Sequence, residues 1–186
     1  RLVGNAMELG RLENGVEQDI QPVNLAHIAE EAVIQMSDVA QSAGASITFG
    51  AQTTSQIVLG QPDRLKQVFL NLLDNAIKYG QPGNQITVAL VSARGGAHCT
   101  VQDTGPGIAP EHLPLVARQY YRAAPASIPG NGLGLAIVSA ILRQHGSRLQ
   151  ITSKTAAVNG EAGAEEHPSG TCVSFMLWSS GRDDGV

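Results

Sequence analysis

The chain has 186 residues, of which 42% are hydrophobic and 15% are charged, and its formal net charge is −4. These values predict one globular domain and exclude a global basic field that would attract nucleic acid or acidic lipid, while local clusters that bind phosphate stay open. No apolar run is long enough to cross a bilayer, and the N-terminus carries no signal-peptide pattern. Two cysteines, Cys99 and Cys172, are too few for a disulfide framework or a zinc site. We expect both to fill the core of a protein in a reducing compartment.

The N-terminal part is predicted to form two helices with a short strand between them. Residues 1–14 carry leucine and alanine at helical spacings. A frayed terminal helix and an interface helix from a preceding domain both stay open. A strand is expected over 19–23, and Asn24 is expected to cap a helix that runs to about residue 43. His27 falls off the apolar face of that helix and is expected at the surface.

Two short segments, 47–49 and 56–58, are expected to pair as a hairpin. The later elements are, in chain order, a helix over 62–79, strands over 85–92 and 97–103, a loop over 104–131, a helix over 132–145, and strands over 148–153 and 171–178. A loop as long as 104–131 is usually functional in a compact domain. The order of elements predicts an α+β fold in which a mostly antiparallel sheet has its helices on one face.

The helix over 62–79 has an unusual polar face, which we call the amide stripe. Its members are Arg64, Gln67, Asn71, Asn75 and Lys78. Asparagine is a poor helix former, so two asparagines one turn apart indicate a functional role for their side chains. Amide oxygens are hard ligands that suit Mg²⁺ without adding negative charge beside a triphosphate, and the lysine can contact a phosphate. Capping of neighbouring backbone groups is an equally open explanation.

A glycine turn follows the strand over 97–103, in the run Asp103-Thr104-Gly105-Pro106-Gly107-Ile108. An ionised carboxylate only accepts hydrogen bonds, so Asp103 at a strand end suits an exocyclic amino group such as that of adenine. The alternative is an ordinary Asp/Gly turn.

A second glycine loop opens the helix over 132–145, in the run Gly130-Asn131-Gly132-Leu133-Gly134-Leu135. Glycines at a helix N-terminus let backbone N–H groups approach an anion. Leu135 stands where the dinucleotide-binding pattern needs its third glycine, and the chain has no Gly-Lys-Ser/Thr run. Both dinucleotide binding and a P-loop are therefore excluded.

Together these motifs resemble the catalytic domain of sensor histidine kinases. The run over 71–79 resembles the N box, 103–108 the first glycine box, 120–122 the F box and 130–138 the second glycine box. Gly170-Thr171 with Phe175 is similar to the closing strand, and the whole resemblance covers roughly residues 20–178. It implies the Bergerat ATP-binding fold, a two-layer α/β sandwich with three main helices on one face of a mixed sheet. It also implies that the loop over 104–131 is a lid over ATP.

The resemblance also implies the roles of individual residues. Asn75, with Asn71 beside it, would hold Mg²⁺, Asp103 would receive the adenine amino group, and Arg122 would reach the γ-phosphate. Asn75, Lys78 and Arg122 would be catalytic. The implied ATP-binding residues are Asn71, Asn75, Lys78, Tyr79, Asp103, Gly105, Gly107, Ile108, Tyr121, Arg122, Gly132, Leu133, Gly134, Leu135 and Thr171.

The lid departs from the family pattern at three positions. Tyr120 stands where the F box usually starts with phenylalanine, Gln119 replaces an arginine, and Ala117 replaces an aromatic residue. Arg118 is a candidate replacement for the missing cation. None of the five histidines stands in the context of the family's phosphoacceptor; they are His27, His98, His112, His145 and His167.

The expected organisation is the end of a dimerisation helix over 1–15, a catalytic domain over 16–180 and a tail over 181–186. The expected partners are the protein's own histidine-containing dimerisation domain and a response regulator, with no nucleic acid. The full-length protein is expected to be a homodimer anchored in the bacterial inner membrane, with this domain monomeric when isolated and located in the cytoplasm. Two alternatives are a nucleotide-sensing module without transferase activity, and an ATPase or serine kinase of the same superfamily. The latter usually has a catalytic glutamate where Asn71 stands.

Overall fold

The computed structural model describes residues 10, 19–123, 128, 130–155 and 169–179. Its elements are β1 (Gln21–Asn24), α2 (Leu25–Ser42), β2 (Ser46–Ala51), β3 (Ile57–Gly60), α3 (Pro62–Tyr79), β4 (Gln85–Ala93), β5 (Gly96–Asp103), α4 (Gly134–Gln144), β6 (Gln150–Lys154) and β7 (Gly170–Trp178). The predicted helix over 1–14 and tail over 181–186 lie outside the described residues, apart from Gly10, which is helical. No helix in the described ranges is long and apolar enough to cross a membrane.

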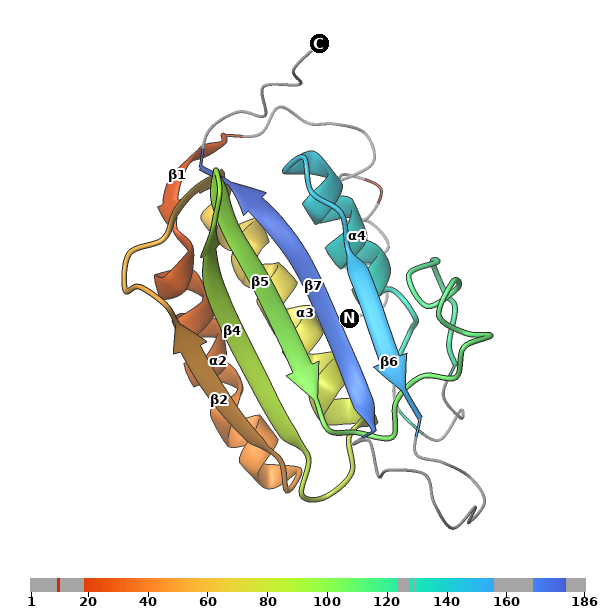
Figure 1. Cartoon of the computed structure of the whole chain (residues 1–186). Helices are drawn as coiled ribbons and strands as arrows, with labels where there is room; N and C mark the ends of the chain where they lie inside the picture. The colour runs from red at the N-terminus through yellow and green to blue at the C-terminus, as the bar shows by residue number, and fades with distance from the viewer. Residues whose placement is uncertain (1–9, 11–18, 124–127, 129, 156–168, 180–186) are drawn as a thin grey trace.

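The strands form a five-stranded sheet in the order β2-β4-β5-β7-β6, and β1 pairs with β3 in a separate two-stranded sheet. Within the larger sheet only β2 and β4 are parallel, and the other pairs are antiparallel. Helices α2, α3 and α4 all lie against the same face of this sheet (Figure 1). The structure therefore confirms the predicted two-layer arrangement.

The core lies between this helical layer and the sheet. Helix α3 buries an apolar stripe that includes Leu65, Phe69 and Leu72, and β4 buries alternate residues on its inner face. Phe69 and Phe175 of β7 meet at the centre, with ring centroids 5.9 Å apart. Burying these side chains removes apolar surface from water and turns the amide stripe of α3 away from the core.

The predicted hairpin of 47–49 with 56–58 is wrong. Strand β2 pairs in parallel with β4, while β3 pairs antiparallel with β1. The Oδ1 of Asn24 caps α2 by accepting from the N–H of Ala26 at 3.2 Å, and it also accepts from the N–H of Gln56 at 3.1 Å. This side chain ties the start of β3 to the end of β1. Alternating polarity shows which face of a short strand is buried, but it does not identify the partner strand.

Helix α4 begins two residues later than predicted, at Gly134. Gly132 has φ +68°, in the left-handed region, so it belongs to the preceding loop. Strand β6 likewise begins at Gln150 rather than 148. Cys99 is fully buried, as predicted for core filling, whereas Cys172 is only partly buried.

Candidate functional site

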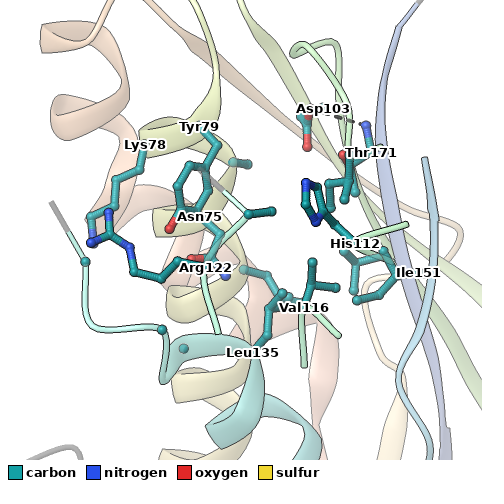
Figure 2. Close-up of a pocket in the computed structure, with 18 of the residues that line it drawn as sticks. Asn75, Lys78, Tyr79, Asp103, His112, Val116, Arg122, Leu135, Ile151 and Thr171 are labelled. Atoms are coloured by element: carbon teal, nitrogen blue, oxygen red, sulfur yellow. Dashed lines mark hydrogen bonds between the residues drawn. The ribbon is translucent and has the colours of Figure 1, made fainter. Parts of the chain in front are cut away.

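A cavity of about 500 Å³ opens between the C-terminal half of α3, the end of β5, the start of β7 and the start of α4. This volume lies in the range of small-molecule sites. The lining includes thirteen of the fifteen predicted site residues, namely Asn71, Asn75, Lys78, Tyr79, Asp103, Gly107, Ile108, Tyr121, Arg122, Gly132, Gly134, Leu135 and Thr171. Lys78 and Arg122 lie at one end, and Asp103 and Thr171 at the other (Figure 2).

The amide stripe of α3 forms one wall of this cavity. The Nδ2 of Asn71 donates to the backbone oxygen of Gln67 at 3.0 Å, which fixes the orientation of the Asn71 carboxamide. A Cβ built on Gly134 would lie 3.5 Å from the Oδ1 atoms of both Asn71 and Asn75. The two amide oxygens therefore converge on the first residue of α4. Backbone capping accounts for the Nδ2 of Asn71 only, since its Oδ1 lies toward Gly134.

The end of α3 carries the cationic side of the site. Lys78 forms an ion pair with Asp74, one helical turn earlier, and both residues line the cavity. A Cβ on Gly130 would lie 3.5 Å from the hydroxyl of Tyr79, so the second glycine loop passes close to this ring. Arg122 donates to the backbone oxygen of Ile128, which holds the guanidinium at the same end of the cavity.

Asp103 forms the opposite end of the site, where β5 ends. Its Oδ1 accepts from the N–H of Gly105 at 2.9 Å and from the N–H of Thr171 at 3.3 Å. Burial raises the pKa of this carboxyl above its ordinary value, and the two backbone N–H groups act in the opposite direction. The carboxylate is thus fixed by backbone donors and directed toward the cavity (Figure 2).

The first glycine loop is tied to the edge of the sheet beside Asp103. Gly107 has φ +77°, and a Cβ there would lie 2.1 Å from the backbone oxygen of Lys154. The N–H of Ile108 donates to the Oγ of Ser153 at 2.8 Å, and this Oγ lies 2.9 Å from the Oγ1 of Thr171. Glycine is required at 107 both for the backbone conformation and for the close approach to β6.

The loop that follows packs its own side chains into the cavity. The Nδ1 of His112 lies 2.7 Å from the hydroxyl of Tyr121, and Val116, which stands between these two residues in the sequence, is buried. The N–H of Tyr120 donates to the backbone oxygen of Gly132 at 2.9 Å. Tyr120 itself has φ 62°, which is unusual for a residue other than glycine. The F box is thereby joined to the second glycine loop.

Two predicted site residues do not line the cavity. Leu133 is fully buried in the core, and its N–H donates to the Oδ1 of Asn131 at 3.2 Å. Gly105 lies behind Asp103 and holds it by the hydrogen bond from its N–H. The side chain of Leu133 thus anchors the loop before α4 to the core.

Sequence reasoning missed several lining residues, among them Asp74, His112, Val116, Asn131 and Ile151. The position of Asp74 beside the site could have been predicted, because an acidic residue four positions before Lys78 is expected to pair with it. The position of Ile151 could have been predicted from the alternation of β6. The position of His112 could not, because it depends on how a long loop folds.

The polar groups around the cavity fit a metal–nucleotide complex. No group of three or more His, Cys, Asp or Glu residues that can hold a metal is found in the described part of the chain. Two convergent amide oxygens are instead a partial oxygen set, which suits Mg²⁺ because this ion keeps waters and takes further oxygens from substrate phosphates. The start of α4 adds a favourable dipole for those phosphates.

Comparison with known proteins agrees with this arrangement. Residues 60–180 match the profile of the family described as histidine kinase-, DNA gyrase B-, and HSP90-like ATPase. The sensor protein QseC of Salmonella typhi is 37% identical over 147 residues, which are 78% of this chain and 32% of QseC. The histidine-protein kinase/phosphatase MprB of Mycolicibacterium smegmatis is 34% identical over 178 residues, which are 95% of this chain and 34% of MprB. The chain thus spans about a third of the length of these relatives.

Solved structures agree on the fold. A mycobacterial sensor histidine kinase MprB superposes with a TM-score of 0.69 at 31% identity, over 85% of this chain and 97% of that one. The structure of full-length ShkA in complex with AMPPNP superposes with a TM-score of 0.79 at 23% identity, over 96% of this chain and 36% of that one. The fold is therefore the predicted Bergerat fold of histidine kinase catalytic domains. The chain belongs to the histidine kinase-, DNA gyrase B-, and HSP90-like ATPase family.

Proposed function

We propose that this chain binds Mg·ATP in the cavity and presents the γ-phosphate to a histidine on the dimerisation domain of the same protein, for relay to a response regulator. The observation that carries the proposal is the polarity of the cavity: Asp103 lies at one end, and Lys78, Arg122 and the amide oxygens lie at the other. Adenine needs an acceptor for its amino group, and a triphosphate needs cations and hard oxygen ligands for its metal.

The proposed roles follow from these positions. Asp103 accepts from the adenine amino group with the carboxylate oxygen that the backbone donors leave available. Asn75 and Asn71 hold Mg²⁺, which neutralises phosphate charge when it is bound. Lys78 exchanges its ion pair with Asp74 for a phosphate, and Arg122 leaves the carbonyl of Ile128 to reach the γ-phosphate. The protein supplies position and charge neutralisation, which are the main requirements of phosphoryl transfer.

The test mixes the chain with ATP, Mg²⁺ and a dimerisation domain that carries the acceptor histidine, and measures acid-labile phosphate on that domain. Asn75→Ala is expected to abolish transfer. Gln67→Ala is the matched control, because this amide belongs to the same stripe but does not line the cavity. It also leaves intact the backbone oxygen that holds Asn71. Unchanged transfer by Asn75→Ala would refute the assignment.

A nucleotide-sensing module is a second candidate. Lys78 and Arg122 both have partners within the protein, and Gln119 and Ala117 depart from the F-box pattern. This candidate predicts ATP binding without transfer to the added domain, so the same experiment separates the two. For the whole protein we propose a homodimer anchored in the bacterial inner membrane, with this domain in the cytoplasm.

A further inference from the structure

Asn84 is a buried polar residue in the turn between α3 and β4, and it does not line the cavity. Its Nδ2 donates to the backbone oxygen of Ala76 at 2.9 Å. Its Oδ1 accepts from the backbone N–H of Thr104 at 3.0 Å and lies 3.2 Å from the Thr104 hydroxyl. One carboxamide therefore joins the last turn of α3 to the residue that directly follows Asp103.

The two groups joined by Asn84 are sequence neighbours of residues that lie at opposite ends of the cavity. Ala76 follows Asn75 and precedes Lys78 in the sequence of α3, and these two residues belong to the end with the amide oxygens and the cations. Thr104 follows Asp103 at the other end, and it is fixed in turn because its Oγ1 accepts from the N–H of Gln85 at 2.9 Å. The Asn84 side chain thus bridges the last turn of α3 and the residue after β5.

Gly80 makes room for this side chain. A Cβ on Gly80 would lie only 2.2 Å from the Nδ2 of Asn84. The backbone angles of Gly80, φ −72° and ψ 167°, are extended and open to any residue. Glycine is therefore needed here for space and not for conformation, and the space is filled by the carboxamide of Asn84.

We propose that Asn84 is a positioning residue that sets the spacing between Asp103 and the amide pair of Asn71 and Asn75. The inference rests on the proposed nucleotide function of the same cavity. A ligand that contacts both ends depends on this spacing, because misplacement of one end costs it contacts at the other. A ligand that contacts one end only does not depend on it.

The experiment compares three ligands in Asn84→Ala, Gly80→Ala and the parent chain by NMR titration at low temperature: Mg·ATP, adenosine and Mg-tripolyphosphate. We expect both variants to bind Mg·ATP about fivefold more weakly, the net effect of about one hydrogen bond, with changes below about twofold for the two fragments. Gln56→Ala is the control, because Gln56 is also buried but bonds to Ser92, outside the cavity lining. It should bind all three ligands like the parent.

A parallel loss for all three ligands would overturn the inference, since Asn84 would then support the fold in general. Unchanged binding of Mg·ATP in both variants would also overturn it. If circular dichroism shows both variants unfolded, Asn84 is a structural residue and the inference is wrong. Failure of the parent chain to bind Mg·ATP is a different result, because it refutes the proposed function without any substitution.

Discussion

The Nδ1 of His112 lies 2.7 Å from the hydroxyl of Tyr121, and both side chains line the cavity. Their ring centroids are 6.1 Å apart and the ring planes are tilted by 53°. The contact joins two parts of the loop that follows the first glycine box, and Val116 of the same loop is buried. The loop is therefore held against the cavity by its own side chains.

Tyr121→Phe is expected to loosen this loop, because it removes the hydroxyl and keeps the ring. A typical hydrogen bond contributes about 1 kcal/mol, so amide hydrogen exchange between residues 112 and 121 should accelerate about fivefold in the absence of nucleotide. Adding His112→Leu to Tyr121→Phe should accelerate it little further, because the bond is already lost. Exchange at the parent rate in Tyr121→Phe would show that the contact does not hold the loop.

Gly134→Ala is expected to raise stability and weaken Mg·ATP binding. Gly134 is helical, and replacing a helical glycine by alanine contributes up to about 1 kcal/mol. The new methyl group would make ordinary contacts of 3.5 Å with the Oδ1 atoms of Asn71 and Asn75, so the chain folds but the two oxygens become covered. Thermal unfolding and calorimetric titration with Mg·ATP measure the two effects.

Gly132→Ala serves as the contrasting variant. Gly132 has φ +68°, and a Cβ there would lie 2.7 Å from backbone atoms of Tyr120 and Tyr121. This change should therefore lower stability as well as binding. The interpretation of Gly134 fails if Gly134→Ala binds Mg·ATP as tightly as the parent.

Asp103→Asn is expected to weaken ATP binding without lowering the free energy of unfolding. Burial raises the pKa of Asp103, so this carboxyl binds a proton more readily in the native state than in the unfolded state. Ionisation of Asp103 therefore lowers the free energy of unfolding as the pH rises above about 4. Asparagine keeps an oxygen for the N–H groups of Gly105 and Thr171 and carries no charge. Urea unfolding at neutral pH should show a variant at least as stable as the parent.

The same variant should bind ATP at least about tenfold more weakly, because a carboxamide N–H₂ would face the amino group of adenine. Affinity for Mg-tripolyphosphate should stay near that of the parent and serves as the internal control. Parent-like ATP affinity would place the adenine elsewhere.

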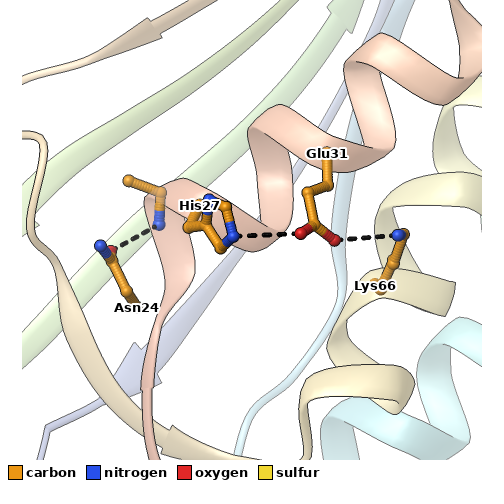
Figure 3. A network of polar contacts seen from close by, with 5 residues as sticks. Asn24, His27, Glu31 and Lys66 are labelled. Carbon is orange, nitrogen blue, oxygen red and sulfur yellow. Dashed lines mark hydrogen bonds and ion pairs between the residues drawn. The ribbon is translucent and has the colours of Figure 1, made fainter.

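Much of the fold and the site could be predicted because local patterns determine them. The period of α3 places Asn71, Asn75 and Lys78 on one stripe, and the glycine loops border strand and helix ends. At the start of α2, the Asn24 cap and the surface position of His27 were also predicted. His27 pairs with Glu31, which in turn bonds to Lys66 of α3 (Figure 3).

The remaining features depend on contacts between residues far apart in sequence. The pairing of β2 with β4 was missed because α3 and β3 lie between them in the chain. His112 has its place only because Tyr121 returns beside it. No sequence pattern singles out Asn84, since its proposed role needs both the space beside Gly80 and the N–H of Thr104.

His145 predicts a dependence of stability on pH. Its Nε2 accepts from the N–H of Gln61 at 3.1 Å, and its Nδ1 lies 2.8 Å from the backbone oxygen of Ile141, so the neutral ring joins the start of α3 to the end of α4. Burial lowers the pKa of His145. The contribution of His145 to the free energy of unfolding is therefore complete above about pH 6.5. It is lost as the pH falls below that value toward the lowered pKa of the folded state.

His145→Leu should lower the free energy of unfolding by about 1–3 kcal/mol at pH above 7, because it leaves the buried N–H of Gln61 without this acceptor. Urea unfolding of the parent and of His145→Leu should show that their difference in free energy of unfolding narrows as the pH falls toward 5. A constant difference would exclude His145 as the titrating group.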